Sequence, residues 1–310
     1  HQIEGVRWLV KRLSGTEEGQ RSLGCIFADS MGLGKTLTVI ATMFTLLRQS
    51  PFEGEGGLVR KCLVVAPLSL VFNWKREFAK WLGPMKLEPL VISGAMKLAD
   101  SEKYESQGFR VAILSFETLA QCAAKFKGSV DLLVVDEGHK LKNPDSKIFA
   151  LLDGFRTRRR LLVTGTPLQN SLEELHACLR FACGEVFGGE TTFRQVFAGP
   201  IAKGLQADAP AFDRALASER ATALLQTIKP HVLRRGADVL AAALPRKREF
   251  VILCELSPQQ KRMMTQCLED FKGVNDKLSD ALAFFAKMYI LMVHHALYTM
   301  SPDHPGALLI

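Results

Sequence analysis

The octapeptide Asp29-Ser30-Met31-Gly32-Leu33-Gly34-Lys35-Thr36 contains the groups that bind a phosphate chain. It follows an apolar run and opens a helical pattern, which is the setting that a phosphate-binding loop requires. The two glycines let backbone N–H groups point at phosphate oxygens, and the helix N-terminus adds partial positive charge. Lys35 would reach the β and γ phosphates, and Thr36 would ligate Mg²⁺. The general pattern has Gly where this chain has Asp29, so a glycine-rich turn before an ordinary helix is the alternative.

An acidic pair, Asp136 and Glu137, ends the apolar run 130–135 about a hundred residues further along the chain. Open parallel sheets bind ligands at the carboxyl ends of their strands. There, Asp136 would hold Mg²⁺ and Glu137 would orient the attacking water. Acidic pairs also end many surface strands, but the alternating β and α patterns between the two motifs let both reach one sheet edge. Together they predict a nucleoside triphosphatase.

The elements that must position these groups form an α/β pattern with a parallel sheet. Apolar runs without alternation predict strands that are buried on both faces, and helical patterns lie between them. The expected strands are residues 23–28, 61–66, 87–92, 110–114, 130–135 and 160–163, and the expected helices are 35–48, 70–82 and 116–126. Residues 53–57 and 188–206 have the pattern of loops. From residue 207 the pattern becomes mainly helical, with one strand-like run at 249–256.

Composition narrows the class of protein. Hydrophobic residues make up 47% and charged residues 23% of the 310 residues, as in soluble globular proteins. No apolar run approaches the ~20 residues that cross a bilayer, so no membrane partner is expected. The net charge of +8 suits a nucleic-acid partner or a soluble basic enzyme equally well. The seven cysteines, with no C-x-x-C, favour reduced thiols and no zinc site.

Several other side chains have competing interpretations. The arginines at positions 156, 158, 159 and 160 could contact phosphates, but a solvated loop is favoured. Trp8, Trp74 and Trp81 lie in helical patterns beside apolar residues, which favours core packing over base stacking. The chain begins at His1 rather than Met, and we expect it to be part of a longer protein.

The phosphate loop resembles the D-E-M-G-L-G-K-T of Swi/Snf-type ATPases in helicase superfamily two, which also begins with Asp, although Ser30 replaces the usual Glu. Further blocks resemble that family in the same order. They are His1-Gln2 with Gly5, Trp8 and Leu9; Ala66-Pro67-Leu68-Ser69 with Asn73-Trp74; Leu114-Ser115-Phe116-Glu117; Asp136-Glu137-Gly138-His139 with Leu141-Lys142-Asn143; Thr164-Gly165-Thr166-Pro167-Leu168-Gln169-Asn170; and Leu233-Arg234-Arg235. The resemblance extends over nearly all of residues 1–298.

The resemblance implies a role for each matching residue. The implied fold is a RecA-like sheet with helices on both faces, followed by a mainly helical protrusion. ATP would be bound by Gln2, which recognises adenine, and by Asp29, Ser30, Met31, Gly32, Leu33, Gly34, Lys35 and Thr36, with Mg²⁺ on Thr36 and Asp136. Lys35, Asp136 and Glu137 would be catalytic. Pro67, Ser69 and Ser115 would contact DNA, and His139, Thr164, Gly165, Thr166 and Gln169 would couple the ATP state to the DNA contact.

The implied activity is ATP-driven tracking on double-stranded DNA in the nucleus. Gly138, where the family more often has Ala, together with residues 197–201 and 203–204, resembles the branch that acts in recombination and repair, whose partners include recombinase filaments and chromatin. We expect a nucleotide-binding lobe at 1–183, a helical region at 184–300 and a linker at 301–310. The second lobe and its Q-x-x-x-R-x-x-R arginines are absent from the sequence, and residues 292–297 match the family's Leu-Cys-Asn-His-Pro segment only loosely.

Three alternatives stay open on the sequence. The first is a chromatin-remodelling ATPase of another branch, and the second is an unwinding helicase of the same superfamily. The third is a DNA- or partner-binding module with little ATPase activity, because second-lobe arginines would have to complete the site. The intact Lys35, Thr36, Asp136 and Glu137 speak against a pocket silenced by mutation.

Overall fold

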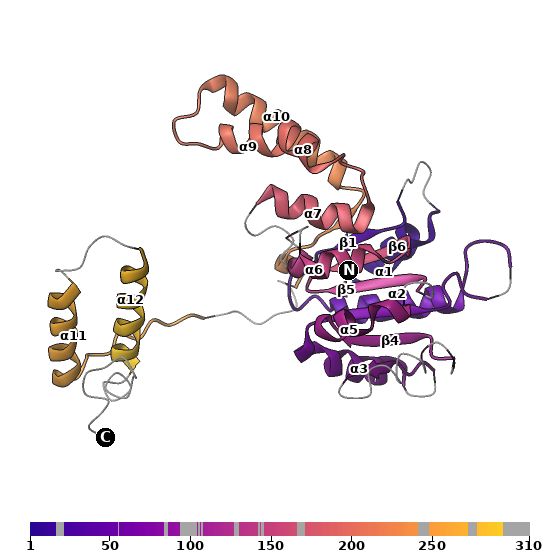
Figure 1. The fold of residues 1–310 in the computed structure, drawn as a ribbon, viewed down its shortest axis with the longest axis horizontal. Coiled ribbons are helices and arrows are strands. Elements are labelled where there is room, and N and C mark those ends of the chain that lie inside the picture. The colour runs from indigo at the N-terminus through magenta and orange to yellow at the C-terminus, as the bar shows by residue number, and fades with distance from the viewer. Residues whose placement is uncertain are drawn as a thin grey trace. The chain divides into compact units, whose positions relative to one another are not determined.

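The structure, a computed structural model, describes residues 1–16, 22–54, 56–83, 86–93, 104, 106, 108–126, 130–141, 143, 146–165, 171–240, 248–271 and 278–293. The chain divides into two compact units, His1–Leu244 and Pro245–Ile310 (Figure 1). The first unit contains a sheet, and the described part of the second unit contains helices.

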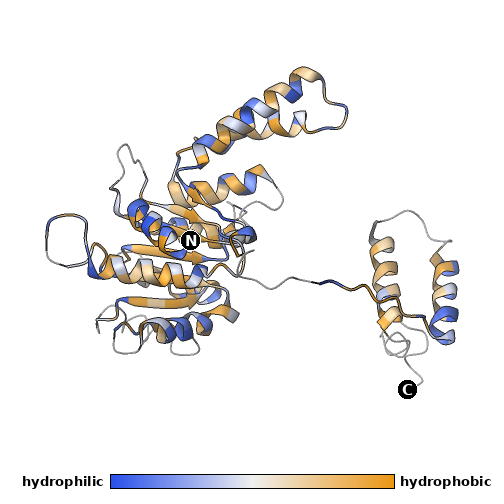
Figure 2. Ribbon diagram, turned by 180° about the vertical axis from the view of Figure 1, so that it is seen from behind, coloured by the Kyte–Doolittle hydropathy of each residue, from blue (hydrophilic) through white to orange (hydrophobic). Residues whose placement is uncertain are grey.

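The sheet has seven parallel strands in the order β3-β4-β2-β5-β6-β1-β7. The strands are β1 (Cys25–Phe27), β2 (Cys62–Ala66), β3 (Leu90–Ile92), β4 (Val111–Ser115), β5 (Leu132–Asp136), β6 (Arg159–Val163) and β7 (Val232–Leu233). The central strands are hydrophobic along their length (Figure 2) because both faces of the sheet are covered. The predicted α/β class with a parallel sheet is confirmed, and six of the strands fall where the apolar runs predicted them.

Helices cover both faces of this sheet. Side chains such as Val64 and Val134 pack against α1 (Gln2–Ser14), α2 (Lys35–Arg48) and α3 (Leu68–Leu82). Alternate side chains of the same strands, such as Val65 and Val135, point to the opposite face, since successive strand residues alternate. There they pack against α5 (Phe116–Phe126), α6 (Lys147–Asp153) and α7 (Leu172–Cys183). The two hydrophobic layers hold the strand ends, and therefore the site, in place.

A helical protrusion follows α7 and projects from the sheet (Figure 1). It consists of α8 (Glu190–Phe193), the π-helical turn η3 (Arg194–Ala198), α9 (Gly199–Gly204) and α10 (Ala211–Ile228). The chain then returns to the sheet, where β7 pairs with β1. The first compact unit therefore extends to Leu244. The cause is this return strand, which the local sequence pattern does not mark.

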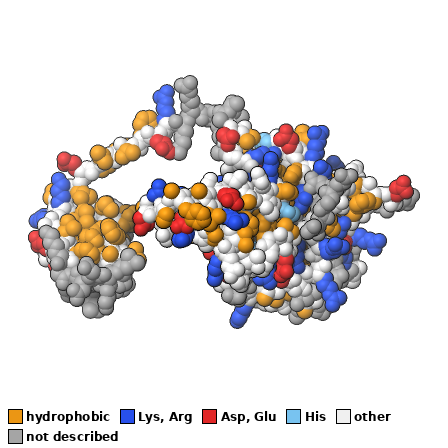
Figure 3. Space-filling model, turned by 90° about the horizontal axis from the view of Figure 1, so that it is seen from above, with side chains coloured by type: hydrophobic (Ala, Val, Ile, Leu, Met, Phe, Trp, Pro, Cys, Tyr) orange, Lys and Arg blue, Asp and Glu red, His pale blue; other side chains and the backbone are white. Residues whose placement is uncertain are grey.

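The second unit contains α11 (Pro258–Phe271) and α12 (Leu278–Val293). The rings of Phe271 and Phe284 stack with centroids 4.2 Å apart, and Gln260 Nε2 donates to Leu291 O at 2.9 Å. Hydrophobic side chains gather over this unit (Figure 3). The strand expected at 249–256 was wrong: these residues form no strand and are almost all exposed. Strand-forming side chains alone cannot build a strand without a neighbour whose N–H and C=O groups pair with it.

Candidate nucleotide site

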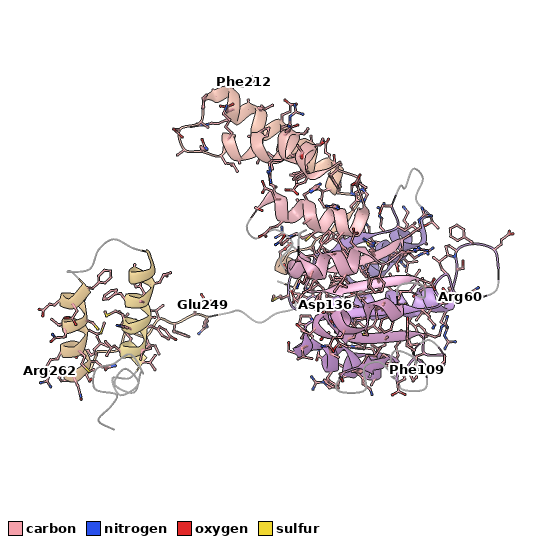
Figure 4. The ribbon with its side chains drawn as sticks, in the orientation of Figure 1. Arg60, Phe109, Asp136, Phe212, Glu249 and Arg262 are labelled. Atoms are coloured by element: carbon pink, nitrogen blue, oxygen red, sulfur yellow. The ribbon has the colours of Figure 1, made fainter. Side chains whose placement is uncertain are left out.

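Three neighbouring strands bring the two chemical motifs to one edge of the sheet. Phe27, the last residue of β1, lies in register with Val163 of β6, and Val163 in turn lies in register with Asp136 of β5. Adjacent strands are about 4.8 Å apart, so the phosphate loop and Asp136 leave the sheet about 10 Å from each other. In Figure 4, Asp136 lies at one edge of the unit, with Arg60 and Phe109 at the opposite edge.

The phosphate loop, residues 28–34, has the backbone that its glycines permit. Gly32 and Gly34 have φ values of 87° and 80°, in the left-handed region that side chains disfavour. The Gln2 side chain occupies the space that a Cβ on Gly34 would need, and Gln2 Nε2 donates to Leu33 O at 3.3 Å. The helix α2 then begins at Lys35. The loop and Gln2 thus meet, as the predicted nucleotide-binding set requires.

Lys35, the first residue of α2, follows the phosphate loop at this edge of the sheet. Its ammonium donates to Asp29 O at 2.8 Å and to Ser30 O at 3.3 Å. Burial lowers the pKa of Lys35, while the negative charges of Glu137, Asp136 and Asp29 act in the opposite direction. The acidic pair is therefore within electrostatic reach of the lysine, and the predicted cation and carboxylates form one cluster.

Asp136 is a buried carboxylate with fixed partners. Trp74 Nε1 donates to its Oδ2 at 2.8 Å, and Glu137 N donates to its Oδ1 at 2.9 Å. Burial raises the pKa of Asp136, and these two hydrogen bonds and the Lys35 charge oppose that rise. Sequence reasoning assigned Trp74 to the core only. It is buried, but its indole N–H also orients Asp136, and its place in the second family block was the signal for this role.

The backbone at Glu137 is strained. Its φ of 54° makes it the one non-glycine residue with positive φ in the described part of the chain. Such a conformation costs about 1–3 kcal/mol and is concentrated at functional sites. A Cβ on Gly138 would lie 2.6 Å from Leu162 Cγ on β6, so a larger residue at this position would require the Leu162 side chain to shift. The replacement of Ala by Gly in the acidic block therefore fits a close contact with the neighbouring strand.

The oxygen atoms at this edge suit Mg²⁺. The Thr36 hydroxyl, at the start of α2, makes no hydrogen bond to any residue that the structure describes. The Asp136 oxygens each accept one hydrogen bond, and each has a further lone pair. Hard oxygen ligands of this kind, few in number and completed by phosphate and water, are what Mg²⁺ takes in nucleotide sites. The residues present therefore fit the predicted ion.

The predicted coupling residues are described in part. Thr164 is buried, and its N–H donates to Phe27 O at 3.0 Å. A Cβ on Gly165 would lie 3.2 Å from Met31 Cγ and 3.6 Å from Lys35 Nζ, so Gly165 lies against the phosphate loop. The described backbone of His139 lies in the 3-10 helix η2 (Gly138–Leu141). Thr166 and Gln169 lie outside the described residues, as does the side chain of His139.

The predicted DNA-contacting residues occupy different environments. Pro67 caps the N-terminus of α3, and Ser69 is exposed in its first turn. Ser115 is buried: its hydroxyl donates to Thr118 Oγ1 at 3.2 Å and accepts from Thr118 N at 3.1 Å. The structure thus leaves Ser69 accessible to a ligand, while Ser115 holds the start of α5.

Arg235 is a site residue that sequence reasoning did not place. Its guanidinium binds the Asp29 carboxylate, with Nη2 2.6 Å from Oδ2 and Nε 3.1 Å from both oxygens. Its backbone N–H donates to Asp29 Oδ1 at 3.0 Å. Because 206 residues separate the two partners, no local pattern could have paired them.

The chain belongs to the SNF2-related domain family, which it matches over residues 1–296. Among characterised proteins, it is similar to the human DNA repair and recombination protein RAD54-like, at 39% identity over 298 residues, covering 91% of this chain and 39% of that protein. It is 36% identical over 317 residues to the DNA repair and recombination protein RAD54 of Saccharomyces cerevisiae, covering 87% of this chain and 35% of that protein. The chain therefore spans less than half the length of these relatives.

Two solved structures have a similar fold. The Sulfolobus solfataricus SWI2/SNF2 ATPase core in complex with dsDNA is 25% identical, with a TM-score of 0.61 over 97% of this chain and 59% of that chain. The core domain of the same ATPase has a TM-score of 0.59 over 97% of this chain and 57% of that chain. The predicted family, its fold and the resemblance to recombination and repair proteins are confirmed. No helix in the described ranges is long and apolar enough to span a membrane.

Proposed function

We propose that this chain is the ATP-binding lobe of a motor that hydrolyses ATP with Mg²⁺ and tracks along double-stranded DNA during recombination and repair in the nucleus. The observation that carries the proposal is the convergence of Lys35, Asp136 and Glu137 at the carboxyl ends of β1 and β5, the two strands that flank β6. Phosphoryl transfer needs mainly positioning and charge neutralisation, and this cluster provides the phosphate-facing cation, the metal-binding carboxylate and the water-orienting carboxylate.

Each group has a distinct task in the proposed reaction. The N–H groups of the phosphate loop and the Lys35 ammonium would hold the phosphate chain, and Gln2, which contacts the loop at Leu33 O, would recognise the adenine. When bound, Mg²⁺ neutralises charge on the phosphate oxygens, and Thr36 and Asp136 would hold it. The Glu137 carboxylate orients the attacking water and accepts a hydrogen bond from it. Trp74 keeps Asp136 in the orientation that this arrangement needs.

DNA contact is proposed for the exposed start of α3. Pro67 and Ser69 follow the carboxyl end of β2, two strands from β6, on the same edge as the phosphate loop. Further along the same helix, Lys75, Arg76 and Lys80 are exposed. The predicted contacts are with phosphates, so binding should be independent of base sequence and steeply weakened by salt. The likeness to an ATPase core solved with dsDNA supports this proposal.

We propose that the segment after β6 couples ATP binding to DNA contact. Gly165 lies against Met31 and Lys35 of the phosphate loop, so a change in the loop on ATP binding would be felt at this segment first. His139, Thr164, Thr166 and Gln169 are proposed to belong to the same relay. Recombinase filaments and chromatin are proposed partners of the whole protein.

Hydrolysis measured with different nucleic acids tests the proposal. In a form of the protein that includes a second lobe, ATP turnover should rise on adding duplex DNA of any sequence, and less on adding single-stranded DNA or RNA. Stimulation should fall steeply as salt is raised. Stimulation by RNA alone would favour the unwinding-helicase alternative. ATP binding without turnover under any condition would favour a binding module.

A further inference from the structure

The phosphate loop contains a buried carboxylate at a position where phosphate loops generally have glycine. Asp29 is 1% exposed, and it lies in the loop that would surround the triphosphate. A buried carboxylate is costly unless it is paired and hydrogen-bonded. Its negative charge also extends to Lys35, because that charge is one of the influences on the lysine pKa. Left alone, such a group would repel phosphates.

Arg235 binds the Asp29 carboxylate at both of its oxygens. Two guanidinium nitrogens and the backbone N–H of Arg235 occupy both oxygens of Asp29. A forked, charge-assisted contact of this type is among the strongest in proteins. The other side of the guanidinium is also held, since Nη1 donates to the carbonyl of His1.

The backbone holds Arg235 in this position. Ala28 N donates to Leu233 O at 2.8 Å and Ser30 N donates to Arg235 O at 2.9 Å, so the returning segment runs beside the loop itself. Gly5 of α1 leaves room for the guanidinium, because a Cβ there would lie 2.8 Å from Arg235 Nη2. The pair is thus built by three parts of the chain that are far apart in sequence.

We propose that Arg235 is a positioning residue for triphosphate binding: it neutralises Asp29 and thereby leaves the charge of Lys35 to the phosphates. This inference rests on the proposed ATP site. Arg235 would act on the phosphates through Asp29 and not by direct contact, because its guanidinium already binds the Asp29 carboxylate and the His1 carbonyl. Asp29 also has a function in this arrangement: the carboxylate ties the loop to the segment that follows the protrusion.

The test is a set of nucleotide titrations of four variants and the parent chain. Arg235→Gln should weaken ATP binding by about tenfold or more, equivalent to about 1.4 kcal/mol. ADP should be affected less and adenosine hardly at all, because the effect of an uncompensated charge grows with the charge of the ligand. The double variant Asp29→Asn/Arg235→Gln should return to within about threefold of the parent, since no lone carboxylate is left. Arg234→Gln, the same change at the exposed neighbouring arginine, should bind like the parent.

Each outcome decides the inference. A double variant that binds ATP as weakly as Arg235→Gln, or equal losses for ATP, ADP and adenosine, would show that Arg235 supports the loop by shape alone and would overturn it. Should Arg235→Gln unfold, Arg235→Lys keeps a positive charge beside Asp29 but loses the fork, and it should bind ATP within about threefold of the parent because the proposal requires the charge and not the fork. Loss of ATP binding in a folded Arg235→Lys would also overturn it. Failure of the parent chain to bind ATP would instead refute the proposed function.

Discussion

The two edges of the sheet use charged side chains in opposite ways. At the amino edge, the cations are taken up by the protein itself: Arg160 binds the Asp153 carboxylate at 2.8 Å and four backbone carbonyls, and Arg159 Nε donates to Leu13 O at 2.9 Å. Lys61 likewise donates to Tyr104 O at 2.9 Å. At the carboxyl edge, Lys35 donates to two carbonyls of its own loop, Asp29 O and Ser30 O. At the amino edge these cations bind groups of the protein, whereas at the carboxyl edge Arg235 neutralises Asp29 and Lys35 stays available to a ligand.

This difference follows from strand direction. Because all strands are parallel, every segment that leaves a strand does so at the carboxyl edge, where loops and helix N-termini converge. The amino edge collects the C-terminal ends of helices, whose carbonyls need donors. A hollow of about 360 Å³ there is lined by Arg158, Arg160 and Arg180 beside the end of α7. The same substitution of a charged side chain should therefore affect ATP binding or turnover at the carboxyl edge and not at the amino edge. Matched substitutions at the two edges can test this.

The largest expected effect is on turnover. Glu137→Gln should retain ATP but lower the hydrolysis rate by roughly 10²–10⁴-fold, because an amide orients and polarises water less well than a carboxylate. Glu185→Gln, the same change at the amino-edge hollow, should leave turnover unchanged. Steady-state ATPase assays with DNA present measure both. Normal turnover in Glu137→Gln would remove this residue from the proposed mechanism.

Nucleotide affinity should show the next largest difference. Lys35→Ala removes the cation that faces the phosphates and should weaken ATP binding by about 10–100-fold. This range corresponds to the loss of about 1.5–3 kcal/mol, which is typical of a hydrogen bond to a charged group. Lys61→Ala, at the amino end of β2, should bind ATP normally. Titration with a fluorescent ATP analogue compares the two. Equal affinity in both variants would contradict the distinction between the edges.

Substitutions of Trp74 and Trp81 can separate two roles of a tryptophan: orienting Asp136 through the indole N–H, and packing as an aromatic ring. Trp74→Phe keeps a buried ring but removes the donor to Asp136, and should lower Mg²⁺-dependent activity by roughly 10–100-fold, as loss of an outer partner of a metal ligand does. Trp81→Phe removes an exposed indole that donates to Glu77, and should have little effect. Activity measured against Mg²⁺ concentration shows whether the loss lies in metal affinity. Unchanged Mg²⁺ dependence in Trp74→Phe would mean that Asp136 needs no such partner.

As the pH falls, Mg²⁺-ATP binding should weaken at a higher pH than it would if Asp136 had the pKa of an ordinary aspartate. Because burial raises the pKa of Asp136 above 3.8, its proton returns at a higher pH as the solution is acidified, and the protonated form binds metal poorly. Without ligand, the folding stability should depend on pH in the opposite sense. Because the pKa of Asp136 is raised in the folded chain, this carboxyl contributes stability at low pH, and the contribution is lost as pH rises through the folded pKa. Calorimetric titrations at a series of decreasing pH values should show the effect with Mg²⁺ and not without it. A flat profile with Mg²⁺ would argue against Asp136 as a ligand.

The smallest effect on ligand binding is expected at Arg160. Arg160→Gln should destabilise the fold, because several carbonyls and Asp153 lose donors, with a fall in unfolding free energy of about 1–3 kcal/mol. ATP affinity should stay within about twofold of the parent, which is about 0.4 kcal/mol. Denaturant unfolding and ATP titration on the same sample give both values. A large loss of ATP affinity in a stable variant would show that the two edges are not independent.

The sequence misjudged the arginine run at this amino edge. It favoured a solvated loop for residues 156–160, and Arg156 and Arg158 are indeed exposed. Arg159 and Arg160 instead donate to carbonyls from α1, α6 and α7. The sequence could not distinguish these arginines from one another, because the partners of Arg159 and Arg160 lie in other helices. Charge count cannot distinguish a cation that faces water from one that ends a helix.

The local sequence by itself determined six of the seven strands, the phosphate loop and the acidic pair, because apolar runs, glycine spacing and a strand-ending carboxylate are properties of short segments. It also predicted the order of the family blocks, and hence the fold. Only the tertiary structure decided that Trp74 orients Asp136, that Ser115 is buried, and that Arg235 neutralises Asp29. The reason is physical: each of these depends on a contact between segments brought together by sheet order, and a buried charge reveals its partner only when the chain is folded.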